Sequence, residues 1–137
     1  MQKPEVIDEE YHFEEGLIIS SADLNGIITY ANRKFCEIAG YTRDELIGKN
    51  HNIIRHPDMP RAAFVELWQT IQAGKEWTGI VKNLRQDGKY YWVYSHISHI
   101  VTKGEVTGFT AARRPTSKAE IEETLVIYAK MLEKENN

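Results

Sequence analysis

Three β-rich segments in the second half of the chain, residues 77–84, 90–101 and 107–113, constrain the fold more than any other feature. Only short connections separate them. Gln86–Asp87–Gly88 lies between the first two segments, and Lys103–Gly104 lies just before the third. Short connections that contain glycine are typical of β-hairpins, so these segments are predicted to be consecutive antiparallel strands.

Two shorter β-rich runs, residues 17–19 and 27–30, flank the sequence Asp23–Leu24–Asn25–Gly26. An Asn-Gly pair tolerates positive φ and favours a hairpin turn. Every link between strands is short except the helical stretch between the second and third strands. We therefore predict an α+β fold in which one five-stranded antiparallel sheet carries short helices on one face.

The stretch between the second and third strands contains several helix signals. Phe35, Ile38 and Ala39 recur at helical spacing, and Thr42–Glu45 has the spacing of a capping box. Asp58 is predicted to cap a third helix that has a proline in its first turn. The apolar stripe of this helix comprises Ala63, Phe64, Leu67, Trp68 and Ile71.

The two ends of the chain differ from the predicted domain, residues 17–115. Residues 1–16 are interpreted as an N-terminal tail, cap or short leading helix. Residues 116–137 are predicted to form an amphipathic C-terminal signalling helix that starts at a capping box, Ser117–Glu120. Its apolar residues have the spacing of a coiled-coil seam and are Ile121, Leu125, Tyr128 and Leu132.

Composition indicates one globular domain and argues against several function classes. A chain of 137 residues, 42% of them apolar, buries roughly two thirds of its unfolded surface. Seventeen Lys and Arg residues face 20 Asp and Glu residues, so we expect no nucleic-acid partner. No apolar run approaches the roughly 20 residues of a membrane span, and the acidic start is unlike a signal peptide, so we expect a cytoplasmic location. Cys36 is the one cysteine, which excludes a disulfide framework.

The sequence contains no arrangement typical of an enzyme. It lacks HExxH, CxxC and Gly-x-Ser-x-Gly motifs and any glycine-rich phosphate loop, so we expect no catalytic activity. His51, His56 and Asp58 are a conceivable metal triad. Residues of these types also serve as caps and turn formers in irregular segments such as 49–57, and we assign no metal.

Two segments are compatible with a ligand site. Trp77, Gly79, Val81 and Asn83 share one face of their strand, which suits either a flat ligand or an ordinary core. Arg55–His56–Pro57–Asp58 leads into a helix N-terminus and suits an anionic group. The alternative, in which Asp58 is only a cap that pairs with Arg55, is favoured by the residues alone.

Several segments together resemble a PAS domain, and specifically the N-terminal PAS domain of bacterial aerotaxis receptors, over roughly residues 17–115. The segments that carry the resemblance are Ile28-Thr-Tyr-Ala-Asn32, Ala39-Gly-Tyr-Thr42, His51-Asn-Ile-Ile-Arg-His-Pro-Asp-Met-Pro60, Ala63-Phe64, Trp77-Thr-Gly-Ile-Val-Lys-Asn83 and Tyr91-Trp92. The block that ends in Arg-His-Pro-Asp-Met-Pro is specific for the aerotaxis type. The resemblance implies noncovalently bound FAD whose redox state reports oxygen and respiratory flux.

The resemblance also implies which residues contact the cofactor. Asn83 would hydrogen-bond the edge of the isoalloxazine, and Trp77 would contact its ring. Phe64 and Trp68 would line the pocket, although core packing explains them equally well. The other positions that match FAD-associated residues of the family are Asn32, Arg55 and His56, the last two on the pyrophosphate or ribose side, and Asp58, which would fix their geometry.

Two differences separate the chain from the related light-sensing LOV flavoproteins. His51 follows Gly48-Lys-Asn50 where those proteins have a reactive cysteine, so no flavin–thiol adduct is expected. Arg113 stands where their final strand has a glutamine that faces flavin N5. By register it shares a face with Phe109 and Ala111, where it would stabilise a reduced anionic ring; the alternative is an exposed arginine at a strand end.

The implied function is a redox switch that signals to a chemoreceptor-type domain or a separate transducer. The opposite sheet face carries Ile80, Leu84, Trp92 and Tyr94 and should contact the leader, the exit helix or a partner. This face and residues 121–132 would transmit the signal, and they would also serve a homodimer. Membrane association would then come through a receptor partner, and the chain is either an excised sensor domain or a stand-alone partner. The alternatives are a haem-based PAS gas sensor with His51 or His56 as ligand, a cofactor-free PAS interaction module, and a redox sensor of the nitrogen-fixation type.

Overall fold

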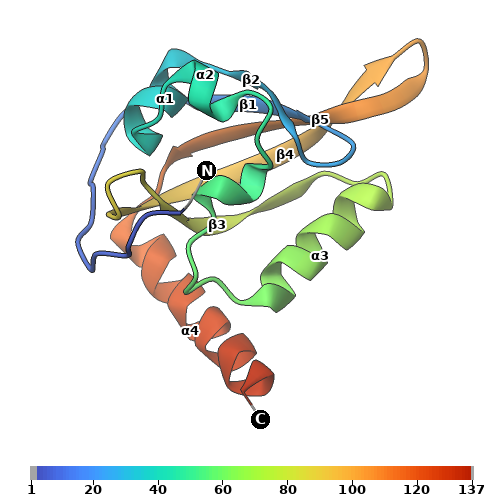
Figure 1. Cartoon of the computed structure of the whole chain (residues 1–137). Coiled ribbons are helices and arrows are strands. Elements are labelled where there is room, and N and C mark those ends of the chain that lie inside the picture. The colour runs from blue at the N-terminus through green and yellow to red at the C-terminus, as the bar shows by residue number, and fades with distance from the viewer. Residues whose placement is uncertain (1–2, 137) are drawn as a thin grey trace.

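A five-stranded antiparallel sheet in the order β2-β1-β5-β4-β3 forms the centre of the molecule (Figure 1). The computed structural model describes residues 3–136. The strands are β1 (Ile18–Asp23), β2 (Ile28–Ala31), β3 (Trp77–Leu84), β4 (Tyr90–Thr102) and β5 (Glu105–Pro115). The predicted α+β fold with one antiparallel sheet is confirmed. The sheet order brings β1 beside β5, so the first and last strands are neighbours.

Short helices cover one face of this sheet, and a long helix follows the last strand (Figure 1). The core between the sheet and the short helices includes Ile18, Ile28, Phe35 and Val93. No helix within residues 3–136 combines the length and the apolar character that crossing a membrane requires. The helices are α1 (Arg33–Ala39), α2 (Arg43–Leu46), the 3₁₀ helix η1 (His51–Ile54), α3 (Arg61–Gln72) and α4 (Lys118–Glu135).

Most predicted helix starts are present, but one is wrong. Capping boxes form at Thr42 and Ser117. Asp58 does not cap α3. Pro60 occupies the N-cap position without a side-chain hydrogen bond, and the Asp58 carboxylate accepts a hydrogen bond from Lys82 Nζ at 2.9 Å. The N-cap position lies two residues beyond Asp58, and the Asp58 carboxylate pairs with the neighbouring strand instead. The segment predicted to be irregular contains η1.

The leader, residues 3–16, runs past the β3–β4 hairpin in an extended form (Figure 1). Ile7 N donates to Gly88 O at 2.8 Å and Tyr11 N donates to Tyr90 O at 2.7 Å. These bonds use N–H groups that a helix would need, so the leading helix considered above does not form. Gly88 is required at this contact, because a Cβ there would lie 2.1 Å from Glu5 O.

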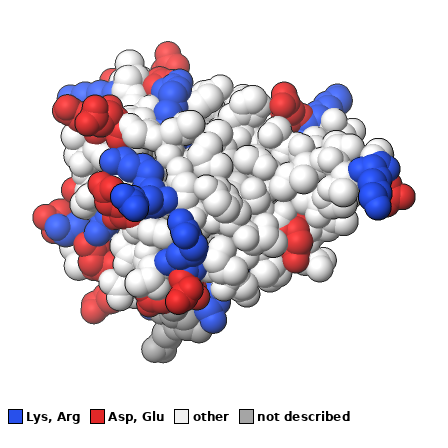
Figure 2. Space-filling model, turned by 90° about the horizontal axis from the view of Figure 1, so that it is seen from above, with Lys and Arg blue, Asp and Glu red and all other residues white. Residues whose placement is uncertain are grey.

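The exit helix α4 packs beside β3 and α3 (Figure 1). Tyr128 is its one buried residue among those described, and its hydroxyl donates to Ile80 O on β3. The leader therefore contacts β4 while α4 contacts β3. Figure 2 shows charges of both signs mixed over the face seen there, with a broad uncharged area between them.

Candidate cofactor site

A cavity of about 150 Å³ lies between the sheet and the short helices. Its walls are mostly apolar. The helix side is formed by α3 and by the segment around η1, and the sheet side is formed by β1, β3, β4 and β5. Of the predicted strand face, Val81 and Asn83 line the cavity, whereas Trp77 and Gly79 do not. The main lining residues of α3 are Phe64, Leu67, Trp68 and Ile71, and those of β5 are Phe109, Ala111 and Arg113.

Arg113 places a buried cation in the cavity wall. Its side chain is 4% exposed, and no carboxylate of residues 3–136 forms an ion pair with it. Nη2 donates to Ser20 Oγ at 2.9 Å and to His51 Nε2 at 2.6 Å. Nη1 is buried and has no partner among the described residues. Two acceptors thus hold Nη2 in place.

The electrostatics of this group are set by burial. Burial lowers the pKa of Arg113 to about 10, so the guanidinium is still protonated at neutral pH. Burial and, after it, the positive charge of Arg113 lower the pKa of His51 to about 3. His51 is therefore neutral. Because a guanidinium only donates, His51 Nε2 is the acceptor, which puts the imidazole proton on Nδ1.

Asn83 and Arg55 connect the cavity to the edge of the sheet. The Asn83 side chain lines the cavity from β3, and the residue is 4% exposed. An isolated antiparallel bridge joins the backbones of Arg55 and Asn83. The Arg55 guanidinium lies 3.7 Å from the centroid of the Phe64 ring. The Arg55 side chain therefore packs on the cavity wall that α3 provides.

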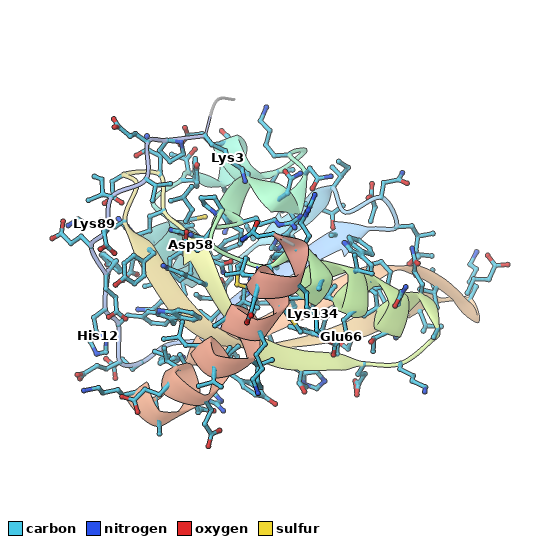
Figure 3. All side chains as sticks on the ribbon, turned by 90° about the horizontal axis from the view of Figure 1, so that it is seen from below. Lys3, His12, Asp58, Glu66, Lys89 and Lys134 are labelled. Carbon is cyan, nitrogen blue, oxygen red and sulfur yellow. The ribbon has the colours of Figure 1, made fainter. Side chains whose placement is uncertain are left out.

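A second, polar cleft of about 320 Å³ shares Asn52 and Arg55 with the cavity. It is also lined by Lys3, His56 and Arg61. Figure 3 shows Lys3 and Asp58 at the same end of the molecule. Arg61 already donates from Nε to Glu135 Oε1 at 3.2 Å, so Lys3 and Arg55 are the cations among the described lining residues that could attract an anion.

His56 adds a donor to this cleft. The residue is 1% exposed, and its Nδ1 accepts a hydrogen bond from Asp58 N at 3.0 Å. Burial, together with nearby Lys82, lowers the pKa of His56, so its ring is neutral and the proton lies on Nε2. Nε2 is buried without a partner among the described residues. A buried donor without an acceptor is costly, and an anion in the cleft would remove that cost.

The predicted site residues fall into three groups. Arg55, Phe64, Trp68, Asn83 and Arg113 line the cavity, and His56 lines the adjoining cleft with Arg55. The register prediction for Arg113 is confirmed, because Phe109 and Ala111 line the cavity beside it.

The third group, Asn32, Asp58 and Trp77, lies outside the cavity lining. Asn32 caps α1 and donates from Nδ2 to Leu17 O at 2.9 Å. Trp77 covers Gly79 with its own ring, since a Cβ at Gly79 would lie 2.5 Å from that ring. The space at Gly79 is therefore filled by Trp77 within the same strand.

Ser20 and His51 accept hydrogen bonds from Arg113, and the sequence did not predict either residue as a partner of that side chain. Ser20 is 1% exposed and pairs with Ala111 across the β1–β5 ladder. Nothing in the sequence signalled that β1 and β5 are neighbours. His51 was considered only as a metal or haem ligand, but its Nε2 faces Arg113 and its ring stacks on Phe35 at a centroid distance of 5.9 Å. Within residues 3–136 no three metal-ligating side chains are grouped.

The lining residues fit a planar ring system that has polar edges. Apolar walls suit its faces, the Asn83 amide donates and accepts, and the Arg113 guanidinium donates. A cavity of about 150 Å³ admits roughly one benzene-sized ring. Because the cavity is partly open to solvent, a fused tricycle would extend out of it or displace the Arg113 side chain or α3.

Comparison with known proteins identifies the family. The family model described as PAS fold matches residues 28–113, which is more than half of the chain. This chain belongs to the PAS family. It is 40% identical over 115 residues to the aerotaxis receptor of Escherichia coli strain K12, a match that covers 84% of this chain and 23% of the receptor.

Another relative and a solved structure support the assignment. The nitrogen fixation regulatory protein of Klebsiella pneumoniae is 31% identical over 105 residues, which cover 76% of this chain and 21% of that protein. This PAS chain thus spans less than a quarter of either relative. The dark structure of the blue-light photoreceptor Aureochrome1 LOV has a TM-score of 0.70 at 22% identity, covering 81% of this chain and 86% of that chain, and it shows the shared fold.

Proposed function

We propose that this PAS domain is a sensor that binds FAD noncovalently and converts its redox state into a signal. The observation that carries the proposal is the buried Arg113 cation, which lines an apolar cavity with no carboxylate partner among residues 3–136 and with Nη1 unpaired. Such an arrangement is costly in a folded protein unless a ligand with negative or acceptor character uses it.

The chain's own groups would hold and tune the ring. Asn83 would pair with its polar edge, while Phe64 and Trp68 would pack on it. A flavin supplies reversible electron uptake, which adds negative charge to the ring. Arg113 would favour that charge, and neutral His51 would keep Arg113 in position by accepting from Nη2. The differing preference of Arg113 for the two redox states would supply the switching energy.

The basic cleft favours a dinucleotide over a mononucleotide. It adjoins the cavity through Asn52 and Arg55, so a molecule bound in the cavity can extend into it. Arg55 and His56 would then contact the pyrophosphate or ribose side of FAD. Riboflavin, which has no phosphate, would gain nothing from this cleft.

Three predicted site residues would act indirectly. Asn32 would position α1 below the ring, and Asp58 would fix His56 through its backbone N–H and Lys82 through its carboxylate. Trp77 would support the cavity floor from its place over Gly79.

The output would go to a signalling partner. The two relatives are named as an aerotaxis receptor and a nitrogen fixation regulatory protein, and both are longer than this chain. We propose that the domain is not an enzyme and that it signals, in the cytoplasm, to a chemoreceptor-type domain or a separate transducer. A homodimer through the sheet face and α4 and a membrane location through the partner belong to the same proposal.

The midpoint potential of the bound flavin tests the role of Arg113. Arg113→Ala should make the potential more negative and weaken redox-dependent signalling, because the cation that favours the reduced ring is lost. Arg114→Ala is the matched control, since Arg114 is exposed and pairs with Glu120. An unchanged potential and unchanged signalling in Arg113→Ala would refute the role of Arg113.

The cleft is tested separately by ligand choice. His56→Leu should weaken FAD binding several-fold and leave riboflavin binding unchanged, because His56 lines only the cleft. Both affinities are measured by titration of flavin fluorescence. An equal loss for the two ligands would place His56 outside a phosphate subsite.

A further inference from the structure

The leader brings a lysine to the wall of the polar cleft. The start of the leader lies beside η1 (Figure 1), and Lys3 Nζ donates to Arg55 O at 3.0 Å. Lys3 lines the cleft together with Asn52, Arg55 and His56. Lys3 and Arg55 are 52 positions apart in the sequence, so this part of the wall exists only while the leader is docked.

The backbone limits where Lys3 can lie. Ile7 N donates to Gly88 O at 2.8 Å and holds the leader against the β3–β4 hairpin. Pro4 follows Lys3, and a residue before proline is restricted to an extended backbone. Lys3 is therefore joined to the anchored part of the leader by a short link of low conformational freedom, which reduces the entropy lost when its side chain binds a ligand.

Lys3 and Arg55 bring two positive charges together. No carboxylate of residues 3–136 forms an ion pair with either side chain. Burial and, after it, the positive charge of Arg55 lower the pKa of Lys3. Two cations that share a cleft repel each other, and an anion bound between them is attracted by both.

The other side chains of the cleft do not replace the charge of Lys3. Arg61 Nε donates to Glu135 Oε1 at 3.2 Å, and the same carboxylate accepts from Arg61 N and Ala62 N, so the charge of Arg61 is already balanced. Burial lowers the pKa of His56, and its neutral ring contributes no charge. Without Lys3, Arg55 would be the one cation of the described lining residues left to attract an anion.

A diphosphate group matches this arrangement. Where it joins two nucleosides, it carries a negative charge on each phosphoryl group, and lysine and arginine hold such groups through charge-assisted hydrogen bonds. Lys3 and Arg55 provide one cation for each phosphoryl group. The ammonium of Lys3 has three N–H groups, so it can donate to a phosphoryl oxygen and keep its bond to Arg55 O.

We infer that Lys3 is a binding residue of the polar cleft and that the docked leader completes the site for a diphosphate group. Lys3 and Arg55 contact the two phosphoryl groups from opposite ends of the chain segment that they connect. The inference deepens the proposed function and rests on it for the source of the diphosphate, which is FAD.

Titration of flavin fluorescence tests the contact. Lys3→Ala should weaken FAD binding about fivefold and leave riboflavin binding unchanged, because riboflavin has no diphosphate. Lys3→Arg keeps the charge and should retain FAD affinity within about twofold. Lys118→Ala is the matched control, since Lys118 is exposed and lines neither the cavity nor the cleft. Equal FAD affinity in Lys3→Ala and Lys118→Ala overturns the inference, and so does an equal loss of affinity for FAD and riboflavin.

ADP tests the cleft without a flavin ring. In flavin-free protein, ADP should shift the NMR signals of the Asn52 and His56 amides at concentrations at which adenosine does not. Lys3→Ala should weaken ADP binding about fivefold relative to Lys118→Ala. ADP binding that is the same in these two variants overturns the inference.

The two ligands separate the inference from the proposed function. A protein that fails to bind FAD but binds ADP through Lys3 would overturn the proposed function and leave the inference standing. A protein that binds FAD without any contribution from Lys3 would overturn the inference alone. Binding of neither FAD nor ADP would overturn both.

Discussion

At the scale of single residues, Arg113 should reduce the stability of the domain in the absence of a ligand. Its charge is buried without a carboxylate among the described residues, and Ser20 Oγ still has His51 Nε2 at 3.0 Å when Arg113 is removed. Arg113→Met should therefore raise the free energy of unfolding by about 1–2 kcal/mol in flavin-free protein. Chemical denaturation measures this, with Arg114→Met as the exposed control. A clear loss of stability in Arg113→Met would show that the hydrogen bonds of Arg113 to Ser20 and His51 outweigh the cost of burying its charge.

His51 should make stability depend on pH. Its pKa is lowered from 6.5 to about 3 by burial, so as the pH falls the unfolded chain binds the proton first. The contribution of neutral His51 is fully present above pH 6.5 and declines toward pH 3, with a slope of up to about 1.4 kcal/mol per pH unit. His51→Gln should flatten the unfolding free energy over this range relative to His12→Gln, a variant at an exposed position. Equal slopes in the two variants would contradict a neutral His51 in the folded protein.

At the scale of elements, Asn32, which caps α1, and Asp58, which was predicted to cap α3, differ in what they should contribute to stability. Asn32 accepts from Phe35 N at 2.9 Å and also holds the strand before β2 through Leu17 and Ile19. Asn32→Ala should lower the unfolding free energy by about 1–2 kcal/mol. Asp58→Ala should cost less than about 1 kcal/mol, because its carboxylate forms only a solvent-accessible ion pair. Chemical denaturation of both variants under one set of conditions measures the two losses of unfolding free energy. A larger loss in Asp58→Ala than in Asn32→Ala would contradict the assignment of Asp58 as a surface ion-pair residue.

The elements themselves could be predicted because their signals are local. Hairpin glycines and capping boxes act within a few residues, so Gly26, Gly88, Thr42 and Ser117 were sufficient to place turns and helix starts. The start of α3 could not be predicted in the same way, because its cap, Glu135, comes from the far end of the chain.

The candidate site was predictable only in part for the same reason. The period-two pattern of β3 placed Asn83 on the cavity face, and the register of the last hairpin placed Arg113 there. The partners of Arg113 depend on β1 pairing with β5, which no local signal encodes. The sequence pattern predicted that Trp77 and Gly79 contact a ligand. In the structure the Trp77 ring itself fills the space over Gly79.

At the scale of the whole molecule, one sheet connects the cavity to both chain ends. The leader pairs with the β3–β4 hairpin, and α4 reaches from β3 to the start of α3. A change in the cavity can therefore reach two surfaces through short paths of packed residues. This arrangement is compatible with the signalling role that we propose.

The measurement that tests the central claim most directly is the flavin content of the purified domain after incubation with FAD. We expect a yellow protein that retains about one FAD per chain through gel filtration and releases intact FAD on denaturation. Arg113→Ala should retain FAD with a more negative midpoint potential. A colourless protein that retains no flavin under any condition, or one that shows a haem spectrum instead, would contradict the claim.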